Sequence, residues 1–439
     1  MAAVKSALDE GSAQALSAGL GEQPWLRDRR MHAWDAFRSL PMPNRSDEYW
    51  QHTDLGALDL ESFSLAESDR AAPTLDVVPR GIAGAAADPE QAQGTLIEWN
   101  GRVIHQPVSP ECAERGVVFE DLASAAESHG DLVRKYFMTD AVQPHESKFA
   151  ALHGAFFSGG VFLYVPERCR VSIPLRAIHG LSGKGLAIFP HTLIVAGPDS
   201  EVSFIDEYTG GDGEGLCCAV TEVFVGAGAR VAYASLQGFD PGVWHFSCQK
   251  TLQQRDSGFR SLAVALGGRL SRLEVQSLLL GQGSSSRMLG LYFGGAGQHF
   301  DSRTLQSHVA PNTSSNLLYK GALKQNGRAV FSGYIKVKKE AQKTDAYQAN
   351  RNLLLDEQAR VDTIPNLEIE ADDVRCSHGA AVGRVDPEHL FYLMSRGISE
   401  RHAERLLVFG FLQDVMEEIE HEGVRAELQQ AIEAKIGRM

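Results

Sequence analysis

An alternation of apolar and polar residues over residues 158–371 is the feature that most limits what this chain can fold into. A period of two places successive side chains on opposite faces of a β-strand. The two faces of the segment 327–339 carry Phe331, Gly333, Ile335 and Val337 on one side and Arg328, Ser332, Tyr334 and Lys336 on the other. No regular helical pattern interrupts this long series of short segments. A β-solenoid or a β-sandwich is therefore expected.

Weak internal repetition favours the solenoid. The segments 197–204 and 226–233 share one layout, apolar–Gly–small–polar–Val–x–aromatic. No long connections separate the segments, and many of the 43 glycines lie in the middle of the chain, where tight turns between short strands need them. We therefore predict a mainly β protein whose core, residues 151–385, is a parallel β-helix.

The N-terminal region, residues 1–150, has mixed character. Apolar residues at near-helical spacing predict a helix over 24–40, with Pro24 in its first turn. Ser46 is expected to cap a second short helix. Asn100-Gly101 predicts a hairpin within 96–106. One or two short helices are expected over 120–138, broken near Gly130. Residues 66–95 are rich in Ala, Pro, Asp and Gly and are expected to form a loop.

The C-terminal region, residues 386–439, returns to helix. Asp386, Pro387 and Gly397 are the expected cap, first residue and end of one helix. Ser399 is expected to begin a second helix, and a third follows Gly423. The predicted apolar stripes are Leu406, Leu407, Phe409, Phe411 and Val415 on the second helix and Val424, Leu428, Ile432 and Ile436 on the third. These helices are expected to cap the end of the β region.

Composition excludes several classes of function. A net charge of −14 repels phosphate backbones, so nucleic-acid binding is not expected. No apolar run approaches the roughly 18 residues that span a membrane. The N-terminal residues lack the charged and apolar regions of a secretory signal, and the six cysteines have no framework spacing. We therefore expect a cytoplasmic protein with free thiols. Without a CxxC pair, no self-contained zinc or iron–sulfur site is expected.

Several catalytic motifs are absent from the sequence. It has no GxxxxGK[ST] loop, so the chain is not expected to hydrolyse ATP alone. It has no GxSxG elbow and no HExxH helix. The glycines of "GGAGQH" (294–299) lack the spacing of a dinucleotide fingerprint. None of these catalytic or nucleotide-binding sites is therefore expected in the chain.

The strongest candidate site lies in "ADDVRCSHGAAVGR" (371–384), which places Cys376 and His378 two residues apart. If strand geometry persists there, both side chains point to one face, with Cα atoms about 6.5–7 Å apart. A thiol and an imidazole can both bind one metal, but two ligands do not complete a four-coordinate site. The remaining ligands would have to come from elsewhere, or from a second chain. The alternative is a buried free cysteine and a hydrogen-bonded histidine at a strand-to-helix junction.

Other cysteines and histidines are weaker candidates. Cys217 and Cys218 are adjacent, so on a strand they point to opposite faces, and one core and one surface cysteine are expected. His299 and His308 flank "FDSRTLQS"; lining one face together is the alternative to being ordinary core or surface histidines.

Residues 329–411 resemble the C-terminal core shared by the SufB/SufD family, scaffold subunits of the SUF iron–sulfur cluster assembly machine. The blocks "AQKTDAYQ", "NLLL", "DDVRCSHGA" and "FYLMSRGI" occur in order over some eighty residues. Weaker likeness covers 299–311 and 149–166. The segment "LPMPNRSDEYWQHTDL" (40–55) is similar to the SufD branch of the family. Residues 1–23 and 66–95 lie outside the resemblance.

The resemblance implies a right-handed parallel β-helix with helical regions at both ends. It implies a heterodimer with SufB, and docking of the ATPase SufC on the C-terminal helical region. The expected SufC-binding face comprises Leu390, Phe391, Leu393, Leu407 and Phe411. By the family's C-S-H-G match, His378 is the histidine implicated in building the nascent cluster, and Cys376 is its neighbouring thiol.

The resemblance also implies a transient iron or iron–sulfur cluster shared with SufB, and it allows a flavin in the full complex. ATP hydrolysis would then belong to SufC, in keeping with the missing phosphate-binding loop. Two other readings stay open: a β-helix enzyme or protein acting on carbohydrate, and a stand-alone structural homodimer.

Overall fold

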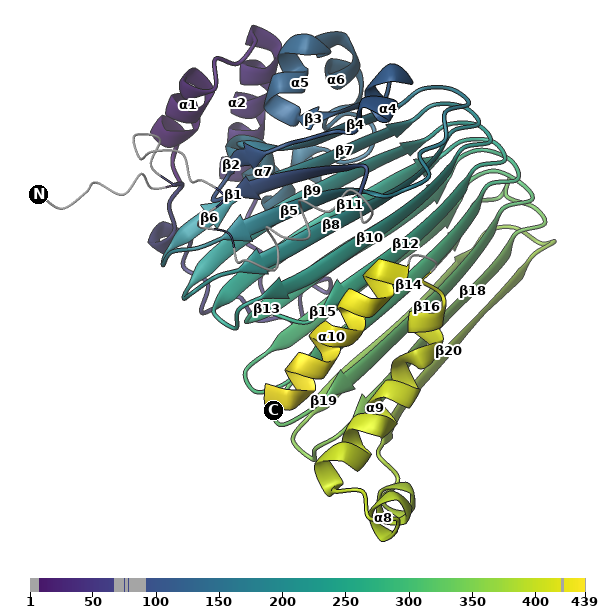
Figure 1. The fold of residues 1–439 in the computed structure, drawn as a ribbon. Helices are drawn as coiled ribbons and strands as arrows, with labels where there is room; N and C mark the ends of the chain where they lie inside the picture. Colours follow the sequence, from purple (N-terminus) through teal and green to yellow (C-terminus); the bar gives the residue numbers. More distant parts are fainter. Residues whose placement is uncertain (1–7, 67–74, 76–77, 79–91, 420–421, 439) are drawn as a thin grey trace, which may run out of the picture.

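The computed structural model describes residues 8–66, 75, 78, 92–419 and 422–438. The chain winds between two facing sheets and forms a parallel β-solenoid, flanked by helices near both ends of the chain (Figure 1). The first sheet has the order β2-β1-β5-β8-β10-β12-β14-β16-β18-β20 and the second the order β19-β17-β15-β13-β11-β9-β7-β4-β3, with β6 beside β9. The predicted parallel β-helix with helical flanks is therefore confirmed.

The strands of the first sheet are β1 (Gly94–Trp99), β2 (Arg102–His105), β5 (Leu175–Leu181), β8 (Glu201–Gly210), β10 (Arg230–Phe239), β12 (Gly258–Ala265), β14 (Ser285–Gly294), β16 (Ser314–Leu323), β18 (Asp345–Leu354) and β20 (Arg375–Arg384). Those of the second are β3 (Val118–Asp121), β4 (Gly159–Val165), β6 (Leu186–Ile188), β7 (Pro190–Ala196), β9 (Gly215–Val225), β11 (Val243–Gln253), β13 (Leu270–Leu279), β15 (His299–His308), β17 (Arg328–Val337) and β19 (Arg360–Ile369).

The helices before the solenoid are α1 (Glu10–Gly19), α2 (Pro24–Ser39), η1 (Leu60–Ser62), α4 (Pro110–Glu114), α5 (Leu122–Ser128), α6 (Gly130–Tyr136), η3 (Pro144–Glu146) and α7 (Lys148–Phe156). Those after it are α8 (Pro387–Ser395), α9 (Glu400–Glu417) and α10 (Glu422–Arg438).

One turn of the solenoid explains the repetition in the sequence. Phe204 on β8 pairs with Tyr233 on β10, and their rings stack inside the solenoid with centroids 6.3 Å apart. The two similar segments therefore lie directly side by side. The turns differ in length, because Arg260 pairs with Arg287, 27 positions on, whereas the Leu317 partner Gln348 lies 31 positions on. This variation hides the period from a search for a constant repeat.

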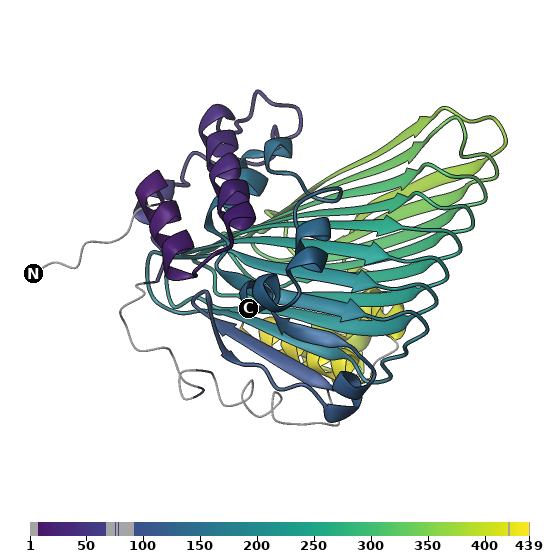
Figure 2. The same cartoon turned by 90° about the horizontal axis from the view of Figure 1, so that it is seen from above.

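Helices α2 and α7 cover the outer face of the second sheet (Figure 2). Every residue of α7 except Lys148 is buried, and a Cβ on its Gly154 would lie only 2.8 Å from that of Ala33 on α2. This cover buries both adjacent cysteines: Cys217 faces the interior of the solenoid, and Cys218 Sγ donates to the carbonyl of Phe149 at 3.2 Å. The predicted surface cysteine is therefore wrong, because the strand's outer face is covered by a helix.

Most local predictions for the N-terminal region hold. The helix over 24–40 is α2, the hairpin is β1–β2, with positive φ at Asn100 and Gly101, and α5 and α6 are the two short helices. The short helix after Ser46 is wrong. The Asn44 side chain accepts the N–H of Ser46 and so forms a local turn in place of a helical one. The predicted loop 66–95 lies largely outside the described residues.

The C-terminal helices do not cap the end of the β region. α9 and α10 lie along the outer face of the first sheet, where they cover apolar residues of β14 and β16 (Figure 1). Lys320 on β16 fixes α9 by an ion pair with Asp414 at 2.6 Å. The expected cap is wrong because the outward side chains of these strands are apolar. A sheet face of that kind must be covered along its length.

The apolar stripe predicted for α9 is also shifted. Of the predicted residues only Val415 is buried, whereas Leu406 is 52% exposed. The buried residues of α9 are Ala403, Val408, Leu412, Val415 and Met416. The stripe of α10 is confirmed at the three positions whose burial is described, Leu428, Ile432 and Ile436, and α10 begins at Glu422, before Gly423.

Glu222 on β9 links the N-terminal region to the solenoid. Its buried carboxyl group accepts the backbone N–H groups of Met138 (2.7 Å) and Val142 (3.0 Å) and lies 3.1 Å from Nε2 of His191. Nδ1 of His191 is 3.0 Å from Nε2 of His153, and Nδ1 of His153 is 2.8 Å from a backbone carbonyl. All three side chains are fully buried.

The backbone carbonyl at the end of this chain of hydrogen bonds determines which atoms of the three side chains carry a proton. A carbonyl only accepts, so Nδ1 of His153 carries a hydrogen and its Nε2 accepts from His191. A neutral His191 then accepts at Nε2, which requires a proton on Glu222. Burial raises the pKa of Glu222 to about 8 and lowers the pKa of His191 to about 3. The carboxyl group is therefore protonated at neutral pH.

We expect this proton to make stability fall as the pH rises. The pKa of Glu222 is about 8 in the folded chain and 4.5 ordinarily, so its contribution is full below pH 4.5 and is lost as the pH rises to about 8. Between these two pH values, the free energy of unfolding should fall by about 1.4 kcal/mol per pH unit. Glu222→Gln mimics the protonated group and should flatten this slope in guanidinium denaturation. Glu357→Gln, at a position 91% exposed, is the matched control. An unchanged slope in the Glu222→Gln variant would contradict the assignment.

Candidate functional site

The C-terminal end of the solenoid is open. Within the described residues, β19 pairs only with β17, and β20 only with β18. β18 buries alternate side chains, whereas most of β20 is exposed. Figure 2 shows these last strands at the end of the solenoid that lies away from the N-terminal helices. An edge strand presents unpaired backbone N–H and C=O groups, so this end is a template for pairing with another chain.

Cys376 and His378 lie side by side on this end. β20 runs through both residues, and they pair with Ala346 and Gln348 of β18, whose side chains are buried. Cys376 packs against a buried cluster that includes Ile335 and Val337 of the opposite sheet, so this face of β20 is the inner face of the solenoid. The predicted shared face is confirmed. The alternative of a buried, hydrogen-bonded histidine is not what the structure shows, because the His378 side chain is exposed and makes no hydrogen bond to a described side chain.

The floor beneath His378 is closed by Gln348. Its amide group donates to the carbonyls of Gly333 at 3.4 Å and Asn366 at 3.3 Å, so it bridges the two sheets. A Cβ at position 333 would lie 2.2 Å from the Gln348 side-chain oxygen, so only glycine leaves room for this bridge. The two candidate ligands therefore lie on the inner face of β20, above a filled interior and at the open end of the solenoid.

The pair could supply two ligands to a metal ion. Burial, with a smaller effect of Asp345, raises the pKa of the Cys376 thiol, so the thiol is neutral until a metal or a cation displaces its proton. Nowhere in the described residues do three or more His, Cys, Asp or Glu side chains gather in a group that would hold a metal. A thiol and an imidazole suit iron and zinc, and any further ligands would have to come from outside the described part of this chain.

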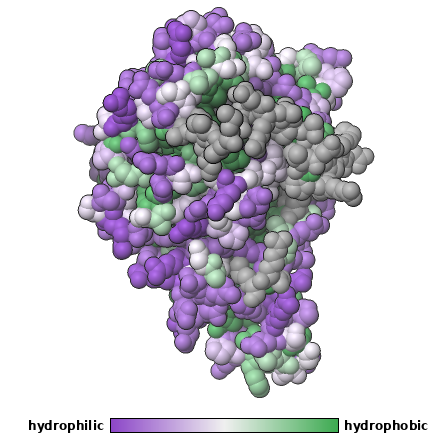
Figure 3. Space-filling model, turned by 90° about the vertical axis from the view of Figure 1, so that its left-hand side faces the viewer, coloured by the Kyte–Doolittle hydropathy of each residue, from purple (hydrophilic) through white to green (hydrophobic). Residues whose placement is uncertain are grey.

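A second feature is the apolar surface of α8. No side chain of this helix is buried; Phe391 is 73% exposed, Tyr392 57% and Met394 43%. Figure 3 shows apolar surface at the lower tip of the molecule, where α8 lies in Figure 1. Exposed apolar residues grouped in this way indicate an interaction site.

The predicted SufC-binding residues lie on two different helices, α8 and α9. Leu390, Phe391 and Leu393 all lie on α8, and none is buried. Leu407 and Phe411 lie on α9, and Phe411 packs beneath the Lys320 ammonium group, 5.0 Å from its ring centroid. Phe411 is therefore turned towards the sheet, away from the exposed surface of α8.

Comparison with known proteins gives the family. A profile described as "SUF system FeS cluster assembly, SufBD core domain" matches residues 179–411, and one for the "SufBD protein N-terminal region" matches residues 17–177. The chain is 32% identical to the iron–sulfur cluster assembly protein SufD of Bacillus subtilis, over 98% of this chain and 99% of that protein. It is 30% identical to SufBD family iron–sulfur cluster assembly proteins of Staphylococcus epidermidis and Staphylococcus aureus, over 94% of this chain and 90% of each.

The chain belongs to the SufBD family of iron–sulfur cluster assembly proteins. The resemblance seen in residues 329–411 is thus confirmed. The SufBD match is wider than the motifs suggested, because the N-terminal profile takes in residues 66–95. Among the described residues, no helix has the length and apolar character needed to cross a membrane.

The solenoid of this chain also contains a buried ionic group that the sequence did not reveal. His179 lies 2.8 Å from Glu98 and 2.9 Å from Asp206, and all three are buried in the solenoid. Burial alone would lower the pKa of His179, but the two carboxylates outweigh it and raise the pKa to about 10. No local motif joins these residues. They meet only because β1, β5 and β8 are neighbours in the sheet.

The other histidines singled out in the sequence do not contribute to the open end. His308 is buried, with its ring nitrogens 2.7 Å from Thr313 Oγ1 and 2.8 Å from Ser315 Oγ. His299 begins the same strand, and the nine-residue separation places the two rings on opposite faces. They therefore do not line one face together.

Proposed function

We propose that this chain is a non-catalytic scaffold subunit that pairs with a SufB-type subunit through the open end of its solenoid. The observation that carries the proposal is that the strand bearing Cys376 and His378 is also an edge strand. Exposed apolar side chains accompany it: Val382 on β20 is 43% exposed and Ile369 on β19 is 41% exposed. An end of this kind gains apolar burial and backbone hydrogen bonds when a second solenoid meets it.

The nascent cluster is the cargo of this interface. His378 and Cys376 supply one or two ligands, and a SufB-type partner facing them supplies the others. Pairing then creates the complete ligand set and dissociation dismantles it, which suits a cluster that must be handed on. The sulfur donor and the iron source lie outside this chain.

The binding site for the ATPase of the system is assigned to α8. A partner of SufC type would bury Phe391, Tyr392 and Met394, which a monomer leaves in water. Because α8 packs against α9, and α9 packs on β14 and β16, a movement of the bound ATPase would be passed to the sheet. We infer that ATP-driven motion reaches the open end by this route.

Flavin has no assigned place in this chain. Gly294 ends β14, and Gly295 and Gly297 lie in the turn that leads to β15, whereas a dinucleotide-binding loop joins a strand to a helix. The residues in this segment therefore do not fit that group, and no step of the proposal uses it.

Co-expression with SufB and SufC from the same organism tests the proposal. We expect native mass measurement to show one copy of this chain, one SufB and two SufC. In the double variant Ile369→Glu and Val382→Glu, SufB should no longer co-purify with this chain, because two charges would be buried at the interface. SufC should still co-purify. Tyr347→Glu, 37% exposed on the outer face of β18, is the control. A SufB-free homodimer of this chain, or SufB capture by the double variant, would overturn the proposed pairing.

A further inference from the structure

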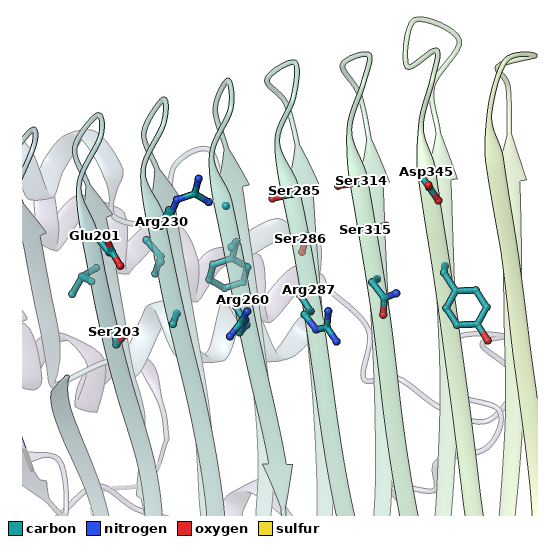
Figure 4. Close-up of a pocket in the computed structure, with 17 residues that line it drawn as sticks. Glu201, Ser203, Arg230, Arg260, Ser285, Ser286, Arg287, Ser314, Ser315 and Asp345 are labelled. Atoms are coloured by element: carbon teal, nitrogen blue, oxygen red, sulfur yellow. The ribbon is translucent and has the colours of Figure 1, made fainter. Parts of the chain in front are cut away.

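The interior of the solenoid contains polar side chains beside the apolar ones. On the first sheet, Arg230, Arg260 and Arg287 point outward along the hollow shown in Figure 4. Side chains alternate between the two faces of a strand, so Ser286, which precedes Arg287, points inward. Its hydroxyl lies 2.8 Å from that of Ser277 on β13, in the facing sheet. Ser277 therefore marks the inner face of the second sheet.

Four polar residues flank the inner face of β13, two on β11 and two on β15. The register of the second sheet places Thr251 and Gln306 on either side of Ser277, and Gln249 and Thr304 on either side of Val275. Residues paired in register point to the same face, so all four side chains point into the solenoid. Neighbouring strands are about 4.8 Å apart, so the four residues surround β13 within about 10 Å.

Each of these four residues has one buried polar atom with no hydrogen-bond partner in the described part of the chain. These atoms are Nε2 of Gln249, Oγ1 of Thr251, Oγ1 of Thr304 and Oε1 of Gln306. None of the four residues is more than 4% exposed. A buried donor or acceptor without a partner is costly, and in folded proteins such atoms nearly always bond to protein or to ordered water.

Tyr319 on β16 adds a fifth atom of this kind from the facing sheet. Its hydroxyl is buried and also has no hydrogen-bond partner among the described residues. A Cβ on Gly290 of β14 would lie 2.2 Å from the ring of Tyr319, so the ring leans over the preceding turn of the solenoid, which is formed by β13 and β14. Donors and acceptors from both sheets therefore face the same turn of the interior.

The position and size of this polar group suit water. Gln348 on β18 bridges the two sheets between the group and His378, so the group is closed off from the open end. The five polar residues are uncharged, and the interior residues beside them are small: Val275 and Ser277 on β13 and Ala263 on β12. An internal water molecule needs two to four polar partners, and these side chains offer five.

We propose that internal water molecules bind over the inner face of β13, hydrogen-bonded to Gln249, Thr251, Thr304, Gln306 and Tyr319. These waters supply the partners that the five side chains lack. They make the middle of the solenoid a hydrated core, in contrast to the apolar cluster at its N-terminal end. The proposal does not depend on pairing at the open end, because the site lies inside a single chain.

Replacing threonine with valine tests the proposal, because valine has the shape of threonine without its hydroxyl group. Thr251→Val and Thr304→Val should each lower the midpoint of guanidinium denaturation of the full chain, since a bound water molecule would lose a partner. In a dry interior the same change would remove an unpaired hydroxyl group and raise the midpoint. The direction of the shift therefore distinguishes a hydrated interior from a dry one.

The reverse change has a matched control. Val275→Thr places a hydroxyl group between Gln249 and Thr304, where water can bond to it, so it should lower the midpoint less than Val231→Thr does. Val231 is 2% exposed within the apolar cluster of the N-terminal turns. A crystal structure of the full chain at atomic resolution should show water within hydrogen-bond distance of the unpartnered atoms. Raised midpoints in both threonine variants, equal losses in the two valine variants, or no water at any of the five atoms would overturn the proposal.

Discussion

Replacing Phe391 and Tyr392 of α8 with aspartate should abolish capture of the ATPase subunit while this chain stays folded. The two rings are 73% and 57% exposed, so the fold does not depend on them. In an interface they would be buried, and buried aromatic anchors typically contribute about 2 kcal/mol or more each. Their joint loss should weaken binding by about a thousandfold. Affinity capture of SufC by the tagged chain, followed by titration, measures the effect.

The control for this variant is Gln413→Asp, which adds an acidic residue at an exposed position of α9. It should capture SufC as the wild type does. A double α8 variant that still captures SufC at wild-type strength would remove α8 from the interface. Loss of SufC together with a lowered melting temperature would show instead that α8 supports the fold.

The expected docking face illustrates how far sequence reasoning reaches. The motif "FYLMSRGI" located α8, and the capping residues Asp386, Pro387 and Gly397 gave its boundaries. The sequence did not reveal that Phe411 turns towards β16, because the contact depends on Lys320, ninety-one positions away in the chain. Apolar residues that face a partner and apolar residues that face the sheet have the same appearance in a linear pattern.

The same limit applies to burial on the strands. Period-two alternation predicted the strands of the solenoid and the shared face of Cys376 and His378. It could not predict that Cys218 is covered, because α7 precedes β9 by some sixty residues. Nor could it find Glu98, His179 and Asp206, which meet only through strand neighbours. Because the turns differ in length, the register must be known before such groups become visible.

The pair Cys376 and His378 is the part of the candidate site that could be predicted from the sequence. The inference that Cys376 and His378 form an incomplete ligand set needs only ligand chemistry and a strand period, and the open end gives that incompleteness a physical reason. A pair at an edge strand, with His378 exposed and Cys376 half-buried beside it, could be completed by ligands of another molecule. This arrangement makes His378 the residue whose removal should have the largest effect on cluster formation.

In the assembled complex, His378→Ala should reduce the yield of iron–sulfur cluster by at least about tenfold and leave subunit composition unchanged. Changes to groups that only orient a metal ligand already cost 10–100-fold in affinity, so the loss of a ligand should cost no less. Because the side chain is exposed and unbonded to described residues, alanine should not disturb the strand. Visible absorption and iron and sulfide content of the purified complex measure the yield.

Two neighbouring variants make the result specific to the imidazole. Ser377→Ala changes the residue between the two candidate ligands, and that residue points to the opposite face of β20. It should give a wild-type yield. Cys376→Ser tests the thiol in the same assay: a loss equal to that of His378→Ala makes both side chains ligands, whereas a full yield assigns the role to His378 alone. Wild-type yield from His378→Ala in an intact complex would remove the open end of this chain from cluster chemistry and leave it a purely structural interface.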